Sequence, residues 1–347
     1  MYELLIGITF SFILTIISLP ILIKVAESNN LFVPKGYRHV HTSNVSALGG
    51  ISIFMSSTFA FIIFSDLVNY PDYKYILSSG LLMFVIGIRD DLYNIKPLIK
   101  LLGQLTAITL LVGYAGVRIQ FIIHFIDGSY GVIADSIITI LIMVAIINAY
   151  NLIDGIDMLA ASIGMVILGS MGIYFFLVNQ TDYSLALLSI ATALLAFMAF
   201  NYYPAKIFMG DTGTLTIGLI MSISLIKLEE VSYLVDSPYT IHSAPGISFA
   251  LISLILFDLI KVALQRMVKG ISIFKADKSH IHHTLLSLGL KPTLISALLS
   301  GFIILQLLIS VILDKLNYNN ITIILTNTAL IITFYLIIYK IKGIISK

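Results

Sequence analysis

Residues 133–178 read IADSIITILIMVAIINAYNLIDGIDMLAASIGMVILGSMGIYFFLV, and this stretch decides the fold class. Its two apolar runs, at 133–150 and 159–178, each have about the length of a helix that crosses a lipid bilayer. The residues that join the two runs include three polar side chains, Asn151, Asp154 and Asp157, and a Gly. The pattern therefore predicts two membrane-spanning helices that are connected by a short polar loop at one membrane surface.

The whole chain has the composition of an integral membrane protein. Of its 347 residues, 59% are hydrophobic and only 11% are charged, and the mean hydropathy is +1.03. A soluble domain has about a quarter charged residues, so this chain has too few to cover a surface that faces water. The composition excludes a soluble enzyme, a disordered chain and a nucleic-acid-binding protein. The absence of Cys excludes disulfides, thiol catalysis and zinc–thiolate sites.

Apolar runs of this kind recur along the chain and predict about eleven transmembrane helices. We expect an all-α integral membrane protein in which residues 1–347 form a single polytopic domain. The predicted spans lie near residues 4–23, 47–66, 75–89, 97–116, 133–150, 159–178, 183–200, 212–228, 245–265, 293–313 and 320–340.

The basic residues predict the orientation in the membrane. If the segment after the first span is cytoplasmic, sixteen of the twenty Lys and Arg residues fall on the inner side, which agrees with the positive-inside rule. The N-terminus is then outside and the C-terminus cytoplasmic, and we expect the protein in the inner (cytoplasmic) membrane. On the outer side, two β-rich runs flank Asp127-Gly128 and predict a small external β-hairpin near 117–133.

Nearly all the side chains suited to catalysis fall in the predicted cytoplasmic loops. Carboxylates at the mouths of membrane helices are costly to bury without a partner. A set of Asp, Asn, Lys and His residues on one membrane face therefore indicates one shared polar site. The loops concerned lie near residues 24–46, 89–100, 148–158, 201–214 and 266–292.

The loop near 89–100 contains two adjacent acids, Asp90 and Asp91, and ends at Lys100. Adjacent helical residues point about 100° apart, so one acid can reach a site while the other orients a neighbour. The alternative is a pair of solvated acids at a helix end. Lys100 begins the next span, where a basic residue also serves as an anchor at the membrane surface.

The loop near 148–158 carries oxygen donors at a regular spacing. Its polar residues recur every three positions across a helix end and a Gly turn, and they are Asn148, Asn151, Asp154 and Asp157. Carboxylate and amide oxygens of this kind suit Mg²⁺ or Mn²⁺. The alternative is a set of caps for the backbone groups of two helix ends.

The segment FMGDTG places Asp211 at the start of a membrane helix. Gly210 and Gly213 would let the backbone approach a ligand closely, and a phosphate could use the helix N-terminus. The alternative for Asp211 is a helix N-cap. Phe208 could stack on a base, although an aromatic residue near a membrane interface is usually an anchor.

The longest inner loop contains His280, His282 and His283 in the segment HIHH. Three imidazoles could bind zinc, donate to phosphate or act as acids and bases. Zinc is disfavoured because there is no His pair at the i, i+4 spacing and no Cys. A solvated polar turn is the alternative. Asp258 lies about two turns inside the preceding span, where an acid indicates function unless Lys261 merely neutralises it.

Four of these segments, in order, resemble the motifs of the polyprenyl-phosphate N-acetylhexosamine-1-phosphate transferases. Eleven spans, an N-out and C-in topology and an external hairpin between the fourth and fifth spans also match that family. The HIHH segment favours the bacterial undecaprenyl-phosphate GlcNAc-1-phosphate transferases, with the phospho-MurNAc-pentapeptide transferases as the alternative. The segments are DDLYNIKPLIK, NAYNLIDGIDMLA, FMGDTGTLTIG and KADKSHIHHTLLSLGL.

The resemblance implies a UDP-N-acetylhexosamine donor, with GlcNAc as the expected sugar, an undecaprenyl-phosphate acceptor within the membrane lipid, and Mg²⁺ or Mn²⁺ as the cofactor. It implies Asn151 and Asp211 as metal ligands. It implies that Lys100 contacts the donor phosphates, and that Asp157 and Phe208 hold the uracil. The full set of expected catalytic residues is Asp90, Asp91, Lys100, His280, His282 and His283. The expected substrate-binding residues are Asn148, Asp154, Asp157, Phe208 and Asp258.

The expected reaction begins a cell-envelope glycan by forming a lipid-diphosphate-linked sugar and UMP. The acceptor phosphate has a second pKa near 6 and is mostly a dianion at pH 7. It can therefore attack directly, and we favour this single displacement over a double displacement with an Asp nucleophile. The first predicted inner loop, near residues 24–46, is called loop 1. It departs from the family's Arg-Lys-x-His run at residues 37–41, and the role of its basic residues stays open.

Two other functions are compatible with parts of the sequence. An ion-coupled transporter would need polar residues at mid-depth, whereas here they cluster on one face. A CDP-alcohol phosphotransferase would share only the Asp-Gly of residues 154–157. The sequence leaves open the sugar, the glycan pathway (teichoic acid, O-antigen or capsule) and the oligomeric state, with a homodimer among the alternatives.

Overall fold

The regular secondary structure of the described chain is α-helical, apart from one isolated parallel bridge between Ser46 and Ile207. The computed structural model describes residues 1–32, 45–67, 72–120, 128–272 and 279–345. Loop 1, including the degenerate basic run at 37–41, lies mostly outside these ranges.

Each predicted span coincides with one long helix, so the all-α fold class is confirmed. The long helices are α1 (Tyr2–Ser28), α2 (Gly49–Phe64), α3 (Tyr73–Tyr93), α4 (Pro97–Tyr114), α5 (Ser129–Ile153), α6 (Leu159–Leu177), α7 (Thr181–Asn201), α8 (Gly210–Leu234), α9 (Ala244–Val268), α11 (Pro292–Lys315) and α12 (Asn320–Ile345). The short helix α10 (Ile281–Ser287) follows His280. The last three residues of the HIHH segment therefore lie in this helix, and only His280 lies outside it. The solvated polar turn, which was the alternative from the sequence, is not formed here.

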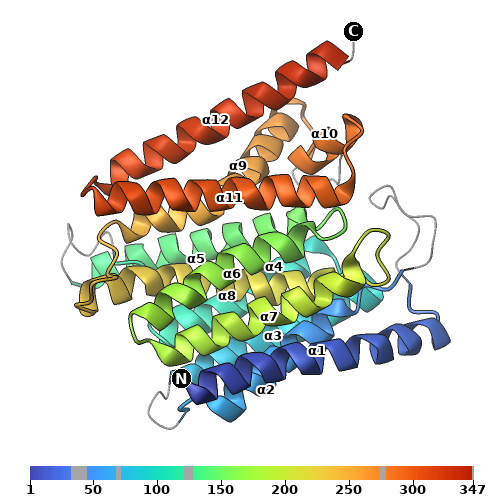
Figure 1. The fold of residues 1–347 in the computed structure, drawn as a ribbon, viewed down its shortest axis with the longest axis horizontal. Coiled ribbons are helices and arrows are strands. Elements are labelled where there is room, and N and C mark those ends of the chain that lie inside the picture. Colours follow the sequence, from blue (N-terminus) through green and yellow to red (C-terminus); the bar gives the residue numbers. More distant parts are fainter. Residues whose placement is uncertain (33–44, 68–71, 121–127, 273–278, 346–347) are drawn as a thin grey trace.

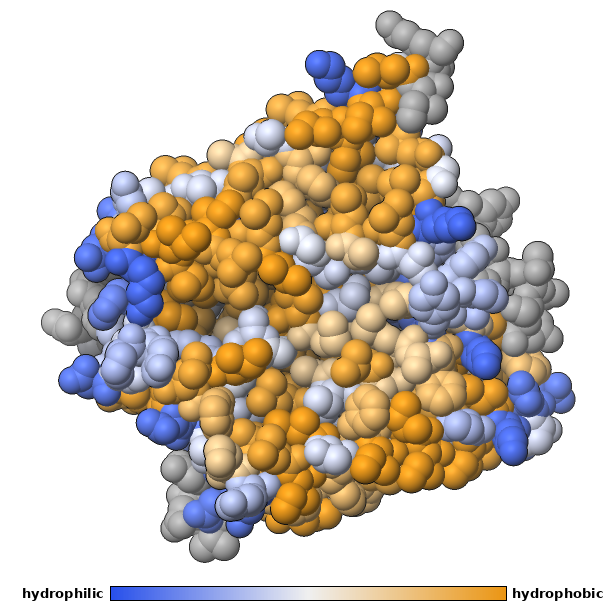
Figure 2. Space-filling model, in the orientation of Figure 1, coloured by the Kyte–Doolittle hydropathy of each residue, from blue (hydrophilic) through white to orange (hydrophobic). Residues whose placement is uncertain are grey.

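Eight of the long helices are apolar enough and long enough to cross a membrane, namely α1, α4, α5, α6, α7, α9, α11 and α12. The apolar helix α2 is shorter. Figure 2 shows apolar side chains over the middle of the visible face and hydrophilic side chains gathered toward its two ends. The chain is therefore a multi-pass membrane protein, while the number of crossing helices and their orientation stay predictions.

The predicted external hairpin is wrong in its second run. Residues 129–133 form the first turns of α5. The buried positions Gly131, Asp135, Thr139 and Met143 recur at every fourth residue, which is the spacing of one helix face. Gly128 precedes the helix with φ +76°. Residues 121–127, which include most of the first run, lie outside the described ranges.

The helix α8 lies in the middle of the bundle and is buried along most of its length. A Cβ on Gly50 of α2 would lie 2.1 Å from the backbone nitrogen of Gly213, and a Cβ on Gly87 of α3 would lie 2.4 Å from the Cα of Thr212. Both helices therefore touch the backbone of the first turn of α8. Small residues allow such close helix packing in membranes.

The ends of the long helices bring the predicted inner loops together. In Figure 1, the C-terminal ends of α1, α9 and α12 lie on the same side of the bundle as α10, and the N-terminus lies on the opposite side. The loop between α7 and α8 packs on the start of α2, because Phe208 donates its backbone N–H to Ser46 O at 2.8 Å and Gly49 donates to Phe208 O at 2.9 Å.

Candidate active site

The first turn of α8 is held by a carboxylate from another helix. Asp91, near the end of α3, accepts hydrogen bonds from the backbone nitrogens of Asp211 at 2.7 Å and Thr212 at 2.9 Å. It also accepts one from the Thr212 hydroxyl at 2.5 Å. Asp91 thus supplies the cap that α8 lacks in its own sequence, where Met209 holds the N-cap position. Its oxygens face the chain, and a catalytic role for Asp91 stays a prediction.

The two glycines of FMGDTG, Gly210 and Gly213, lie in close contact with neighbouring segments of the chain. Gly210 has φ +72°, and a Cβ there would lie 2.2 Å from Ala47 O and 2.7 Å from an Asp91 oxygen. Gly213 faces Gly50 of α2 at similarly close range. The close approach that the sequence predicts is therefore made by α2 and α3. The N-terminus of α8, which the sequence offered to a phosphate, is bound by Asp91.

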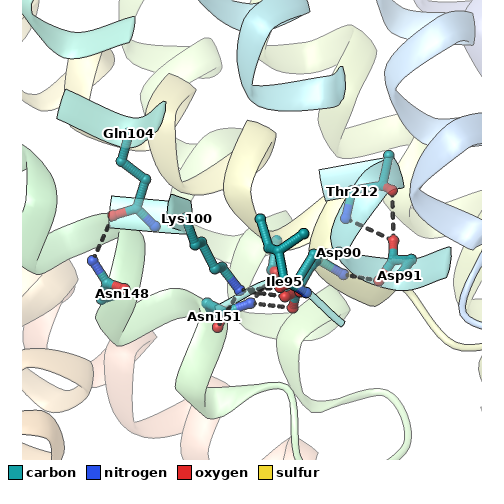
Figure 3. Close-up of polar contacts among 10 residues, drawn as sticks. Asp90, Asp91, Ile95, Lys100, Gln104, Asn148, Asn151 and Thr212 are labelled. Atoms are coloured by element: carbon teal, nitrogen blue, oxygen red, sulfur yellow. Dashed lines mark hydrogen bonds and ion pairs between the residues drawn. The ribbon is translucent and has the colours of Figure 1, made fainter. Parts of the chain in front are cut away.

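Lys100 joins three of the predicted loops at one point (Figure 3). Its Nζ lies 3.0 Å from Asp90 Oδ2, and it forms an ion pair with Asp211. It also donates to Asn151 Oδ1 at 3.5 Å. The Lys100 side chain is only 14% exposed, so these contacts are partly shielded from water. The four residues come from α4, α3, α8 and α5, and this cluster is called the Lys100 cluster below.

Asn151 and its neighbours tie the cluster to the helices. Asn151 donates its amide to Asp211 Oδ1 at 2.6 Å and to the Thr214 hydroxyl at 2.7 Å. Asn148, one turn earlier, donates to Gln104 Oε1 at 2.9 Å (Figure 3). Thr212, Thr214 and Gln104 were not predicted from the sequence. A Thr in a membrane helix usually bonds to its own backbone, so the two Thr residues gave no indication of a site.

Two carboxylates, those of Asp90 and Asp211, contact the ammonium of Lys100, and Asp91 lies close to Asp211. Burial and the charge of Asp211 raise the pKa of Asp91 to about 7. Burial and the Asp211 carboxylate also raise the pKa of Asp90. Burial would raise the pKa of Asp211 as well, but the hydrogen bond from Asp90 and the charge of Lys100 outweigh it and lower that pKa. The pKa of Asp90 is therefore raised and that of Asp211 lowered, so of this coupled pair Asp90 takes up a proton first.

Asp154 and Asp157 have different surroundings, although only three residues separate them. Asp154 keeps partial exposure and makes no hydrogen bond within the described chain. Burial of its carboxyl, with the charges of Asp211 and Asp91, raises the pKa of Asp154 to about 8. Asp157 is 3% exposed and accepts from the Ala205 backbone nitrogen at 3.0 Å.

The carboxylate of Asp157 thus fixes the segment before α8, and its backbone oxygen accepts from the Ser296 hydroxyl of α11 at 3.0 Å. A direct contact between Asp157 and uracil has no support in this geometry. Phe208 is half-buried, and its backbone bonds to the start of α2. The ring remains a candidate for stacking on a base.

The three histidines lie together against the loop after α5. The rings of His280 and His282 are nearly parallel with centroids 5.7 Å apart, and those of His282 and His283 are 4.3 Å apart. A Cβ on Gly155 would lie 2.4 Å from His282 Nε2. The structure therefore places His282 beside Gly155, the residue after Asp154, which agrees with one shared site.

His282 is buried and neutral. Its side chain has neither ring nitrogen hydrogen-bonded in the described chain. Burial, with a smaller effect from His283, lowers the pKa of His282 to about 3. A neutral imidazole adds no positive charge to a phosphate site, and both ring nitrogens of His282 are buried without a hydrogen-bond partner in the described chain.

Asp258 is fully engaged with the chain. Its Oδ2 lies 2.7 Å from His280 Nδ1. Its Oδ1 accepts from Lys261 Nζ at 3.1 Å, the Ile281 backbone nitrogen at 3.0 Å and the Tyr335 hydroxyl at 2.9 Å. The predicted contact of Asp258 with substrate has no support here, because these four donors occupy a carboxylate that is 1% exposed.

The residues of the Lys100 cluster suit a divalent cation that also binds substrate. No three His, Asp or Glu side chains converge in the described ranges as a complete metal site. However, Mg²⁺ is commonly bound by one or two carboxylates together with substrate phosphates. Asp211 offers a partly exposed carboxylate, Asn151 an amide oxygen, and the surplus of negative charge at this point favours a cation.

Comparison with known proteins gives a consistent result. The model of the family described as glycosyl transferase family 4 matches residues 73–229, which include the Lys100 cluster. The chain is 30% identical over 312 residues to a probable undecaprenyl-phosphate N-acetylglucosaminyl 1-phosphate transferase of Bacillus subtilis, and the match covers 87% of this chain and 83% of the relative.

Two further relatives have similar names. The undecaprenyl-phosphate alpha-N-acetylglucosaminyl 1-phosphate transferase of Yersinia pestis is 28% identical over 306 residues, which are 85% of this chain and 80% of the relative. The decaprenyl-phosphate N-acetylglucosaminephosphotransferase of Mycobacterium tuberculosis is 28% identical over 310 residues, which are 82% and 76% of the two chains.

Proposed function

The chain belongs to glycosyl transferase family 4, and from this membership we propose that it transfers N-acetylglucosamine 1-phosphate from UDP-GlcNAc to undecaprenyl phosphate. The observation that carries the proposal is the Lys100 cluster. It gathers an ammonium, carboxylates and an amide from four helices at the end of the bundle where the predicted inner loops meet.

The proposed reaction is a phosphoryl transfer between two anionic substrates. An oxygen of the lipid phosphate forms a bond to the β-phosphorus of UDP-GlcNAc, and the bond from that phosphorus to the bridging oxygen breaks. UMP leaves, and GlcNAc-diphospho-undecaprenol remains in the membrane. Because the two substrates repel each other, charge neutralisation and alignment are the main tasks of the site.

Lys100 is the residue best suited to neutralise the donor diphosphate. Its position among Asp90, Asp211 and Asn151 means that an incoming phosphate would compete with carboxylates for the ammonium. A divalent ion held by Asp211 and Asn151 would supply a Lewis acid for the phosphate oxygens. Asp90 lies beside Lys100, and in its ionised form it could accept the remaining proton of the lipid phosphate.

The location of the cluster fits the two substrates. The lipid phosphate lies at a membrane surface, and a nucleotide sugar is water-soluble. A site at the mouths of α3, α4, α5 and α8 is where both can meet. We place this surface in the cytoplasm and the protein in the cytoplasmic membrane, because the positive-inside rule puts most basic residues on this side.

The proposal is tested with purified protein, undecaprenyl phosphate, Mg²⁺ and a panel of radiolabelled UDP-sugars. We expect a labelled lipid from UDP-GlcNAc with release of one UMP per lipid formed, and loss of activity in EDTA that Mg²⁺ or Mn²⁺ restores. Initial-rate plots should intersect, since direct attack needs both substrates bound. Transfer from another UDP-N-acetylhexosamine alone would correct the sugar. No labelled lipid from any donor would contradict the proposal.

A further inference from the structure

The C-terminal helix α12 reaches the histidine segment through one hydroxyl. Tyr335, on α12, donates its hydroxyl to Asp258 Oδ1 at 2.9 Å, and the other oxygen of that carboxylate holds His280 Nδ1 at 2.7 Å. We propose that Tyr335 is a positioning residue for His280 and acts through Asp258. The inference rests on the proposed function, in which the histidine segment serves the transfer.

The contact to Asp258 determines which nitrogen of His280 faces the site. The carboxylate accepts a hydrogen bond, so His280 Nδ1 carries a proton. Its Nε2 makes no hydrogen bond within the described chain; in a neutral ring this nitrogen accepts from a substrate hydroxyl or amide, and in a protonated ring it donates to a phosphate oxygen. The ring orientation is fixed in the same way, because Asp258 Oδ1 also accepts from the Ile281 backbone nitrogen, directly after His280.

The hydroxyl of Tyr335 fixes the carboxylate itself. Lys261 bonds to Asp258 Oδ1 from the same helix at 3.1 Å, and it also donates to Ser279 O at 2.9 Å. Tyr335 approaches from a different helix, so its hydrogen bond adds a further restraint on the carboxylate to those from Lys261 and the Ile281 backbone. In metal sites, loss of a partner that orients a ligating imidazole typically lowers metal affinity or activity by roughly 10- to 100-fold, and we expect an effect of the same kind here.

The ring of Tyr335 has a separate, structural role. It packs against Phe257 with centroids 5.0 Å apart, and Lys261 Nζ lies 5.1 Å from its centre. A Phe at position 335 would keep this packing and lose only the hydroxyl. The substitution Tyr335→Phe therefore separates the positioning role from the stability of the bundle.

The test compares Tyr335→Phe with Tyr339→Phe in the same transfer assay. Tyr339 lies one turn further along α12, 40% exposed and with its ring 6.3 Å from that of Tyr335. We expect Tyr335→Phe to lower kcat by roughly 5- to 50-fold, with the KM of both substrates and the Tm close to those of the parent. Tyr339→Phe should behave as the parent.

A double-mutant cycle with His280→Gln shows whether the effect passes through the histidine. We expect Tyr335→Phe to have little further effect on kcat in the His280→Gln background. Additive losses, an equal loss in Tyr339→Phe, or parent-like kcat in Tyr335→Phe would each overturn the inference. If His280→Gln has no measurable rate, the kcat, KM and Tm of Tyr335→Phe decide alone. An inactive parent would instead contradict the proposed function.

Discussion

At the scale of single residues, the adjacent acids of α3 illustrate what a sequence can predict about a site. Neighbouring helical residues must point in different directions, so different tasks for Asp90 and Asp91 were predictable. Which acid would face Lys100 was not, because that depends on how α3 is rotated against α8. The structure directs Asp90 to Lys100 and Asp91 to the backbone of α8.

This difference predicts that Asp91→Asn lowers stability, whereas Asp90→Asn lowers activity. Asp91→Asn should lower the free energy of unfolding by about 1–3 kcal/mol, because it turns an amide toward backbone donors that need an acceptor. Asp90→Asn should keep the Tm of the parent and lose most activity. Thermal unfolding in detergent and kcat provide the measurements. A stable Asp91→Asn protein, with a Tm equal to the parent's, would contradict the capping role.

The neutral, buried His282 predicts a pH dependence of stability. Its pKa is about 3 in the folded protein and about 6.5 when unfolded, so the unfolded chain binds more protons between these values. Stability should therefore fall as the pH falls below about 6.5. At pH 5 the loss from this residue is about 2 kcal/mol.

The measurement is the Tm between pH 7.5 and 5 for the parent, His282→Asn and, as a control, a substitution of the exposed His242 by Gln. The parent and His242→Gln should lose Tm on acidification more steeply than His282→Asn. Equal slopes in all three proteins would show that His282 is not the group responsible.

At the scale of helices, apolar length alone predicted the positions of the long helices closely. The short helix α10 was missed because seven residues between polar loops give no periodic signal. The second run of the hairpin predicted near 117–133 was wrong because a turn signal at Asp127-Gly128 was given more weight than the four-residue spacing that begins at Gly131. Partners of Asp157 and Asp258 were also beyond prediction, since they come from distant helices.

Helix packing predicts a strong effect of one added methyl group. Gly50→Ala should displace the first turn of α8, because the new Cβ would lie 2.1 Å from the Gly213 nitrogen. Asp211 would move with that turn, and kcat should fall by roughly 100-fold, as misplacement by about 1 Å can cause. Gly113→Ala in α4 is the control, since no atom of a neighbouring residue would lie within 4 Å of the added methyl group. Parent-like activity in Gly50→Ala would contradict the tight packing.

At the scale of the whole molecule, one shared site requires all predicted inner loops to lie on one membrane side. The bundle places the Lys100 cluster and the histidines at the same end. This agrees with a topology in which the spans alternate in direction and the inner loops share one membrane face. Membrane orientation itself follows only from the positive-inside rule. A direct test of orientation is therefore needed.

The Cys-free chain allows that test with single introduced thiols. Ser272→Cys, at an exposed position after α9, should resist membrane-impermeant thiol reagents in intact cells and react in inverted vesicles. Ser237→Cys, between α8 and α9, should show the opposite pattern. Labelling of Ser272→Cys from outside would place the histidine segment on the wrong side for a cytoplasmic donor.

In the proposed function, the Lys100 cluster catalyses the transfer of a sugar together with its phosphate. Its most direct test follows ³²P from the β-position of UDP-GlcNAc into undecaprenyl lipid, using the parent, Lys100→Met and Lys96→Met. Lys96 is exposed and lies one turn before Lys100, so it controls for the loss of one charge. We predict that the label enters the lipid at equal rates in the parent and Lys96→Met, and at least about 100 times more slowly in Lys100→Met. Label that stays with the nucleotide, or a Lys100→Met protein as fast as the parent, would contradict the account.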